Sequence, residues 1–411
     1  MNILYLTTDI AWPLGFGGEI RKWNVLQGLL RAGRTDAVVC RRSSEPLAQA
    51  AFAGCGRILE LPARDFLRSP RVTRLHRSTL GRGWLTLSSP FPYEYRSAGL
   101  AALRTQLKRA IDPEDYDLIW FATPRAALFF TGRRRVASVL DGDDFSYVRN
   151  LGLLRSAPWY GAKLLDYLDV AKMWAWERTD PRRFSFIVRC SAEDRARIPA
   201  ANIVVIPNGA EVPREVKRAP RPRILFVGYL GYAPNRQGME WFLRAVWPIV
   251  RRGVPRAELD IVGLEPSAAL LAAHGNEGVS VHGFIEDLTP LYERAALSIV
   301  PLLAGSGTRL KILEALGRAV PVVSTTLGAY GIDAGRAQGL ERADAAESFA
   351  AACVAHLEDC AGEALRRAER GRERVLERYD WTAIRVQVGE LARRAVAAHS
   401  SQSGRLTSAR K

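Results

Sequence analysis

The run LSIVPLLAGSGTRLKILEALGRAVPVVSTTLGAYGI, residues 297–332, decides the fold. Residues 297–303 form an apolar segment long enough for a buried strand, and residues 320–325 form a second one. Between them, residues 309–316 place apolar side chains at helical spacing. A strand, a helix and a further strand in this order predict a parallel βαβ unit.

The turn Gly305-Ser306-Gly307-Thr308 separates the first strand from the helix. A helix N-terminus offers unpaired backbone N–H groups and the positive end of the helix dipole, and glycines let the backbone approach a ligand. Arg309 and Lys311 add full positive charges, so the turn favours an anion such as a phosphate or diphosphate. Glu314, one turn into the helix, can accept hydrogen bonds from two hydroxyls, as on a ribose.

Three other interpretations of this turn can be compared with its residues. A Rossmann fingerprint would need a third glycine where Leu310 stands, and a Walker P-loop would need Gly-Lys-Ser/Thr at the helix start. An ordinary strand–turn–helix with solvated charges agrees with the residues as well as an anion site does.

Residues 305–332 resemble the donor-nucleotide motif of the retaining GT-B glycosyltransferases, group 1 (family 4). The resemblance implies that Glu314 binds the donor ribose. The family's longer motif has a second glutamate, which would fall at Ser306 and is therefore absent. The sequence is similar to a subgroup that carries Gly-x-Gly-Thr-Arg-x-Lys at this turn.

The N-terminal residues repeat the strand–loop–helix order. A strand at 3–7, a glycine-rich loop at 13–18 and a helix at 19–30 place the loop where open α/β sheets bind ligands. Residues 17–21 are similar to the family's Gly-Gly-x-x-Arg, which lies near the donor diphosphate and the acceptor.

The family's first loop in the C-terminal domain usually has Gly-Arg-Leu and then Lys-Gly, whose cations hold the diphosphate. This chain has Gly228-Tyr229-Leu230 and Gln237-Gly238 instead. We expect Arg309 and Lys311 to replace the missing charge and so to be catalytic through electrostatics, with help from Arg236; no residue stands out as a catalytic base. The predicted donor contacts are Gly17, Gly18, Arg236, Gly305, Ser306, Gly307, Thr308, Arg309, Lys311 and Glu314.

Two polar loops follow predicted strands at 117–121 and 136–140. Many members of the family carry a histidine in the first loop, where this chain has Ala122 and Thr123. The aspartates after the second strand could bind acceptor hydroxyls or cap the following helix. The predicted acceptor contacts are Arg21, Thr123, Asp141 and Asp144. No metal is expected, since the resembling fold normally works without one.

A chain of 411 residues predicts two domains. Alternating strands and helices in both halves predict α/β domains with parallel sheets. The resemblance implies the GT-B arrangement, two doubly wound Rossmann-like domains facing a central cleft. We predict an acceptor-binding domain at 1–207, a nucleotide-sugar domain at 208–376, a helix at 377–398 that crosses back, and a disordered basic tail at 399–411.

Composition narrows the class of protein. Hydrophobic residues make up 48% and charged residues 25%, as in soluble globular proteins. No apolar run approaches the ~20 residues of a membrane span, and the first strand leaves no room for a signal peptide. Five cysteines lack metal-binding spacing, so a reducing cytoplasm is expected. The net charge of +16 indicates anionic partners.

A basic segment at 64–84 interleaves cations with apolar residues. Its spacing predicts either a helix that docks on an anionic membrane or an ordinary solvated face. The proposed docking stripe consists of Arg68, Arg71, Arg74 and Arg77 beside Leu67, Val72 and Leu75.

These features together predict a cytoplasmic glycosyltransferase, with peripheral attachment to the inner face of the cytoplasmic membrane as a further expectation. It would move a sugar, with retention, from a nucleotide-diphosphate sugar to a glycan or lipid-linked acceptor of cell-surface polysaccharide or glycolipid, without a cofactor. One alternative is a GT-B-like sugar-nucleotide epimerase. The other is a basic nucleic-acid-binding protein, although helix-turn-helix, zinc and RRM signatures are missing.

Overall fold

The computed structural model describes residues 1–12, 14, 17–41, 45–61, 78–88, 90–92, 100–129, 136–305, 307–359 and 362–408. The chain separates into two compact units. One contains Met1–Pro207 and Ile384–Lys411, and the other contains Asn208–Ala383. The predicted basic stripe at 67–77 and the predicted donor residue Ser306 lie outside the described residues.

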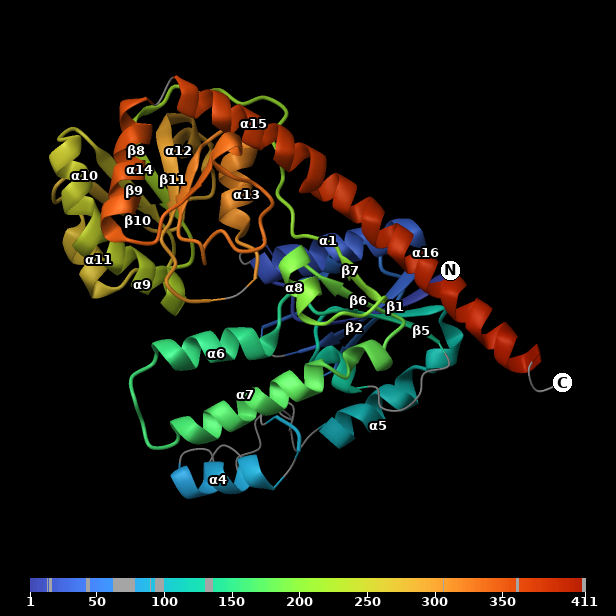
Figure 1. Ribbon diagram of the computed structural model, residues 1–411. Helices are drawn as coiled ribbons and strands as arrows, with labels where there is room; N and C mark the ends of the chain where they lie inside the picture. Colours follow the sequence, from blue (N-terminus) through green and yellow to red (C-terminus); the bar gives the residue numbers. More distant parts are fainter. Residues whose placement is uncertain are drawn as a thin grey trace. The chain divides into compact units, whose positions relative to one another are not determined.

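The N-terminal unit is built on a parallel sheet, in which the described residues form seven strands in the order β3-β2-β1-β4-β5-β6-β7 (Figure 1). The direction of strand order reverses between β1 and β4, which opens a crevice at their carboxyl ends. The strands are β1 (Asn2–Thr8), β2 (Arg34–Cys40), β3 (Ile58–Leu61), β4 (Leu118–Phe121), β5 (Ala137–Asp141), β6 (Phe186–Arg189) and β7 (Ile203–Val205).

Helices cover this sheet, and α6, α7 and α4 form a stack in which α7 lies between the other two (Figure 1). Apolar strand residues are buried on both faces, as expected for a parallel sheet. The α-helices described in this unit are α1 (Gly17–Ala32), α4 (Thr79–Leu87), α5 (Leu100–Ala110), α6 (Ser146–Ser156), α7 (Lys163–Glu177), α8 (Ala192–Arg197) and most of α16 (Trp381–Ser408).

The last helix, α16, packs closely on α1. A Cβ atom added to Gly28 would lie 2.8 Å from the carbonyl oxygen of Arg385 and 2.9 Å from Cβ of Val388. The Arg385 Nε–H also donates to Oδ1 of Asn24 at 2.8 Å. Glycine at position 28 therefore permits the two helices to approach.

The prediction of a disordered tail from residue 399 is wrong for the described residues, because α16 continues to Ser408. A helix that is already formed extends at little cost per added residue. The hydroxyls of Ser400 and Ser401 also donate to the carbonyls of Val396 and Ala397, at 3.1 and 2.9 Å, so these polar residues stay within the helix.

The C-terminal unit contains a second parallel sheet, with six described strands in the order β10-β9-β8-β11-β12-β13. Its order reverses between β8 and β11. Ile224 and Phe226 belong to the core on one face and Leu225 to the core on the other. The strands are β8 (Arg221–Val227), β9 (Glu258–Val262), β10 (Val279–His282), β11 (Ala295–Val300), β12 (Val322–Ser324) and β13 (Leu340–Arg342).

Helices α9 to α13 lie between successive strands, α13 links β11 to β12, and α14 and α15 follow the last strand. The α-helices described in this unit are α9 (Ala233–Trp241), α10 (Trp247–Gly253), α11 (Ala268–Ala273), α12 (Thr289–Arg294), α13 (Leu310–Gly317), α14 (Ala346–Glu358) and α15 (Glu363–Arg378). Within the described part of the chain, every helix is too short or too polar to cross a bilayer.

Candidate functional site

The turn between β11 and α13 has a backbone that only glycine adopts easily. Gly305 has φ +118° and Gly307 has φ +81°. A Cβ at Gly305 would also lie 2.7 Å from Nη2 of Arg309. Arg309 is the residue before the helix, and its Nη1–H donates to the carbonyl of Gly307 at 3.0 Å. The two glycines therefore let the backbone turn sharply at the N-terminus of α13, close to the guanidinium of Arg309.

Lys311 extends from the first turn of α13 to the carboxyl end of β8. Its Nζ donates to Oδ1 of Asn235 at 3.0 Å and lies 4.2 Å from the centre of the Phe226 ring. A Cβ on Gly228 would lie only 2.4 Å from Nζ, so glycine at 228 makes room for the ammonium group. Asn235 is fixed in turn, because its Nδ2–H donates to the carbonyl of Tyr229 at 2.8 Å.

The ammonium of Lys311 is unstable in this environment. Burial, and to a smaller extent the nearby charge of Arg309, lower its pKa to about 7, while the carboxylate of Glu314 acts in the opposite direction. Lys311 lies near the end of a parallel strand, and its charged form is poorly compensated there. An anionic ligand bound beside it would stabilise the charged form.

Binding of a nucleoside diphosphate is expected to raise the pKa of Lys311 and thus to take up protons. At pH 8 the free protein carries mostly neutral Lys311, so up to about one proton should be absorbed per ligand, and affinity should fall as pH rises above 7. Titration calorimetry at pH 8 in two buffers of different ionisation enthalpy measures this uptake. Equal apparent enthalpies in both buffers, or the same uptake by Lys311→Met, would contradict the assignment.

Glu314 lies on the same helix beside a cluster of polar groups. Burial raises the pKa of its carboxyl, and the charges of Arg318 and Lys311 lower it. The guanidinium of Arg318 lies 4.9 Å from the centre of the Tyr292 ring. Within the described residues, the buried hydroxyls of Tyr292 and Thr308 lack a hydrogen-bond partner. The buried carboxylate of Glu314 can therefore accept hydrogen bonds from the hydroxyls of a ligand.

Changing Glu314 to alanine is expected to weaken nucleotide-sugar binding by about 1.5–3 kcal/mol per lost charged hydrogen bond. The fold should persist, because the carboxylate has no hydrogen bond to another described residue whose loss would leave a buried group unpaired. Calorimetry gives the dissociation constant, and thermal unfolding controls for the fold. An unchanged dissociation constant would remove Glu314 from the site.

The donor contact predicted for Arg236 stays a prediction. Arg236 follows Asn235 in the first turn of α9 and is half-buried, and the residue that contacts Lys311 is Asn235. Sequence reasoning missed Asn235 and Phe226, because an uncharged amide and a strand phenylalanine carry no charge signal. The loss of the usual cation after Gly228 was the available clue.

The N-terminal unit has a cavity of about 260 Å³ at the carboxyl ends of β1, β4 and β5. It lies where the strand order of the sheet reverses, which is the usual ligand crevice of such a sheet. Of the residues predicted from sequence, five line this cavity: Gly18, Arg21, Thr123, Asp141 and Asp144. The predicted donor residue Gly17 is the first residue of α1, next to Gly18.

Arg21 and Asp141 are bound to each other at one wall of this cavity. Nη2 of Arg21 lies 2.9 Å from Oδ1 of Asp141, and their side chains are 4% and 3% exposed. Arg21 also donates to the carbonyl of Ile206 at 3.3 Å. Because their polar atoms are used within the protein, we revise their predicted role from acceptor contacts to a link that positions the cavity wall.

The loop after β5 contains Asp143, one of the aspartates that the sequence offered as either acceptor contacts or helix caps. Asp143 has φ +42°, a left-handed backbone that is uncommon outside glycine, and the Cys190 S–H donates to its Oδ1 at 2.7 Å. Asp144 lies nearby, with Oδ1 3.7 Å from Nη1 of Arg149. Thr123 Oγ1 accepts from the backbone N–H of Ala126 at 3.2 Å. The acceptor roles of Thr123 and Asp144 stay predictions.

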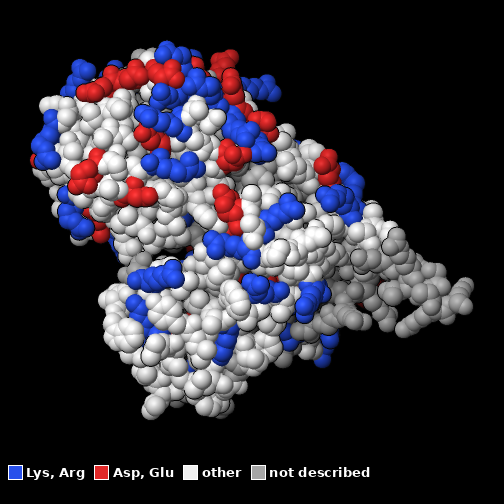
Figure 2. Space-filling view, viewed as in Figure 1, with Lys and Arg blue, Asp and Glu red and all other residues white. Residues whose placement is uncertain are grey.

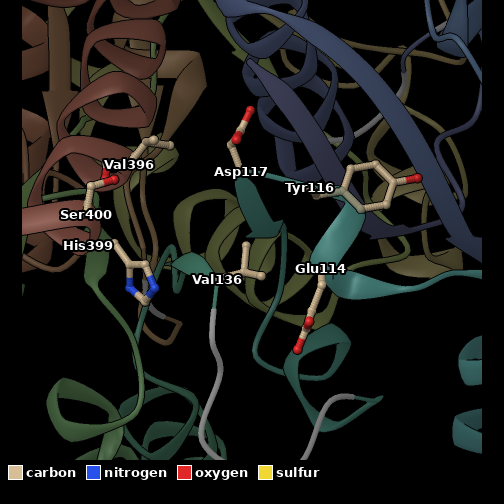
Figure 3. Close-up of a pocket in the computed structure, with 7 residues that line it drawn as sticks. All are labelled: Glu114, Tyr116, Asp117, Val136, Val396, His399 and Ser400. Carbon is tan, nitrogen blue, oxygen red and sulfur yellow. The ribbon is translucent and has the colours of Figure 1, made fainter. Parts of the chain in front are cut away.

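A second cavity of about 250 Å³ lies at the amino ends of β4 and β5 of the same sheet. Figure 3 shows His399 and Ser400 of α16 on one side of it and Glu114 and Asp117, at the start of β4, on the other. Because ligands of open parallel sheets bind at the carboxyl ends of the strands, we assign no function to this cavity. Among the described residues, no group of three or more His, Cys, Asp or Glu could hold a metal ion.

Comparison with known proteins connects this architecture with sugar transfer. Residues 221–359 match the family model described as glycosyl transferases group 1. An uncharacterized 44.6 kDa protein in the cps region of Klebsiella pneumoniae is 30% identical over 147 residues. That match covers 34% of this chain and 38% of the length of that protein.

Solved structures match over nearly the whole chain. A sucrose-phosphate synthase (tll1590) from Thermosynechococcus elongatus has a TM-score of 0.68 at 18% identity, covering 97% of this chain and 100% of that one. Anabaena Alr3699/HepE, solved in complex with UDP-glucose, has a TM-score of 0.61 at 14% identity, with 95% and 99% covered. WaaG, a glycosyltransferase involved in lipopolysaccharide biosynthesis, has 0.59 at 13%, with 95% and 99% covered.

These likenesses confirm the predicted fold class, a GT-B fold with two parallel-sheet α/β domains. The family match lies within the C-terminal unit, which carries the turn before α13. The predicted subgroup with the Gly-x-Gly-Thr-Arg-x-Lys turn stays a prediction.

Proposed function

We propose that this protein is a glycosyltransferase that takes its sugar from a nucleotide-diphosphate sugar. The observation that carries the proposal is the position of Lys311, a buried cation of lowered pKa beside a glycine turn at a helix N-terminus. The match of residues 221–359 to glycosyl transferases group 1 supports it. Structural neighbours of the same fold were solved with UDP and with UDP-glucose, which supports the same class of donor.

The proposed reaction breaks the bond between the anomeric carbon and the diphosphate oxygen, and the nucleoside diphosphate leaves with the electron pair. The anomeric carbon forms its new bond to an acceptor hydroxyl oxygen, and the proton of that hydroxyl passes to the leaving diphosphate. Arg309, Lys311 and the N–H groups of the turn stabilise the charge that develops on this leaving group. Asn235 positions Lys311 by accepting its hydrogen bond. Glu314 binds the ribose. Retention of anomeric configuration, which the family resemblance implies, is part of the proposal.

We place the acceptor at the cavity that Thr123 and Asp144 line in the N-terminal unit. A glycan or a lipid-linked acceptor of cell-surface polysaccharide or glycolipid is proposed, and the relative in a cps region supports polysaccharide. Peripheral attachment at the inner face of the cytoplasmic membrane belongs to the same proposal. Metal-independent transfer stays a prediction, which activity in the presence of a chelator would test.

The test is release of free nucleoside diphosphate from a panel of nucleotide sugars, with and without candidate acceptors. We expect release to depend on the acceptor and the labelled sugar to appear in a larger product. An epimerase would convert the sugar nucleotide without releasing the diphosphate. Release of no diphosphate with any donor, combined with tight binding of nucleic acid on a filter, would contradict the proposal.

A further inference from the structure

Large apolar side chains are exposed on the helices α4 and α7 of the N-terminal unit. On α4, Leu80, Trp84 and Leu87 are 89%, 63% and 71% exposed. Their spacing of four and three residues places them on one side of the helix. On α7, Leu164 and Leu168 are 67% and 38% exposed. These two helices thus present apolar side chains that are exposed among the residues the structure describes.

The exposed side of α4 belongs to a helix that is fixed in place. Its opposite side is buried through Gly81, Leu85 and Thr86. Arg82 forms an ion pair with Asp166 of α7, and Nζ of Lys172 on α7 donates to the carbonyl of Thr86. The apolar face is therefore a stable surface feature, held outward by contacts on the other side of the helix.

The segment that connects α6 to α7 adds to this surface. Trp159 in the connection is 70% exposed, and Trp174 near the end of α7 is 46% exposed. The guanidinium of Arg178 lies 4.8 Å from the centre of the Trp174 ring. We call the exposed side chains the α4–α7 surface, which consists of Leu80, Trp84, Leu87, Trp159, Leu164, Leu168 and Trp174.

The charges around the α4–α7 surface are mostly positive. In α4, α6, the connection and α7, the acidic residues are Asp166, Asp169 and Glu177, and each is buried or half-buried. Arg155 and Arg178 are exposed. In Figure 2 the part that carries these helices, at the lower edge, is largely white with scattered blue groups. In sequence, Arg68, Arg71, Arg74 and Arg77 lie just ahead of α4.

We propose that the α4–α7 surface docks on the headgroup region of an anionic lipid bilayer. Tryptophan and leucine on a surface bordered by arginine suit the interface of a bilayer, where apolar rings enter the acyl boundary and cations meet anionic headgroups. The absence of exposed carboxylates in these described helices makes the charge complementary to anionic lipid. This inference names the surface for the membrane attachment that is part of the proposed function. It rests on that attachment and not on the proposed donor site.

Sedimentation of the full chain with vesicles tests the surface. The test variant is Leu80→Ser, Leu87→Ser and Leu164→Ser together. The matched control is Leu271→Ser, Leu376→Ser and Val386→Ser, since these aliphatic residues on α11, α15 and α16 are 54%, 40% and 50% exposed. The vesicles are pure phosphatidylcholine, or phosphatidylcholine with about one third phosphatidylglycerol.

We expect wild type and control to bind the anionic vesicles equally, and less strongly in high salt or on neutral vesicles. The partition coefficient of the test variant onto anionic vesicles should be at least about tenfold lower than that of wild type. Binding of the test variant equal to the control, or no binding of wild type to anionic vesicles, would overturn the proposal. So would a wild-type dimer in gel filtration that only the test variant breaks, because a second copy would then cover the surface.

Nucleotide-sugar titration of the same three proteins separates this proposal from the donor site. Unchanged donor affinity with lost vesicle binding would support docking through the α4–α7 surface. Vesicle binding without any affinity for nucleotide sugars would contradict the proposed donor site but not the proposed docking surface.

Discussion

Replacing Lys311 by methionine is expected to lower turnover by about 10²–10³-fold, the loss typical of one transition-state charge contact, and to stabilise the folded protein. Methionine keeps much of the length of the side chain and removes a charge that is costly because it is buried and lies near the charge of Arg309. Adding Arg309→Ala should lower turnover further, with far less effect on binding of the bare nucleoside. A lost activity with a gained stability is an unusual combination, because most substitutions at buried sites destabilise.

The pH dependence of the free energy of unfolding should differ between wild type and Lys311→Met. The pKa of Lys311 is about 7 in the folded protein and near 10.5 ordinarily. The unfolded chain therefore binds more protons between these values, so this group makes wild-type stability rise with pH from 7 toward 10.5. In Lys311→Met that contribution should vanish.

Chemical unfolding at pH 7 and at pH 9.5, together with turnover at pH 7, measures both effects. Lys108→Met is the matched control, since Lys108 is exposed on α5. Near-normal turnover of the double variant Arg309→Ala and Lys311→Ala would defeat the assignment, as would a loss of stability in Lys311→Met at pH 7.

Breaking the ion pair between Arg21 and Asp141 is expected to destabilise the N-terminal unit by about 3–5 kcal/mol. Both side chains are at most 4% exposed, so removing either one leaves a buried charge without its partner. Asp141→Ala and Arg21→Met should each show this loss in the unfolding transition of that unit. The double variant should lose less than the sum of the two single variants, because it leaves neither charge alone.

The exposed pair of Arg366 and Glu363 provides the control for this experiment. Their side chains are 62% and 38% exposed, and Arg366→Met should change stability by at most about 0.5 kcal/mol. A loss below about 1 kcal/mol for Asp141→Ala would return Asp141 to the candidates for direct acceptor contact, because the pair would then contribute little to the fold.

Local signals in the sequence were sufficient for most of the architecture. The apolar run predicted as a strand at 297–303 and the amphipathic run predicted as a helix at 309–316 are short-range patterns, and the structure has the strand at Ala295–Val300 and the helix at Leu310–Gly317. Both sheets are parallel, as alternation of strand and helix requires. The predicted end of α16 failed because it depended on composition, which says little about a helix that is already anchored by packing on α1.

The site was less predictable because its contacts join residues far apart in sequence. Lys311 meets Asn235 across 76 positions, and Arg21 meets Asp141 across 120. Sequence reasoning found the charged members of these contacts, since charge is visible in a motif. It had no means to see that Arg21 and Asp141 neutralise each other, or that Gly228 leaves room for an ammonium group from another element.

Thermal unfolding of wild type and Lys311→Met with a panel of nucleotide-diphosphate sugars tests the donor site most directly. We predict that at least one ligand raises the melting temperature of wild type by several degrees when it exceeds the dissociation constant about a hundredfold. The same ligand should shift Lys311→Met much less, relative to its own ligand-free melting temperature. Equal shifts in both proteins, or no shift of wild type with any sugar nucleotide, would contradict a donor site at the N-terminus of α13.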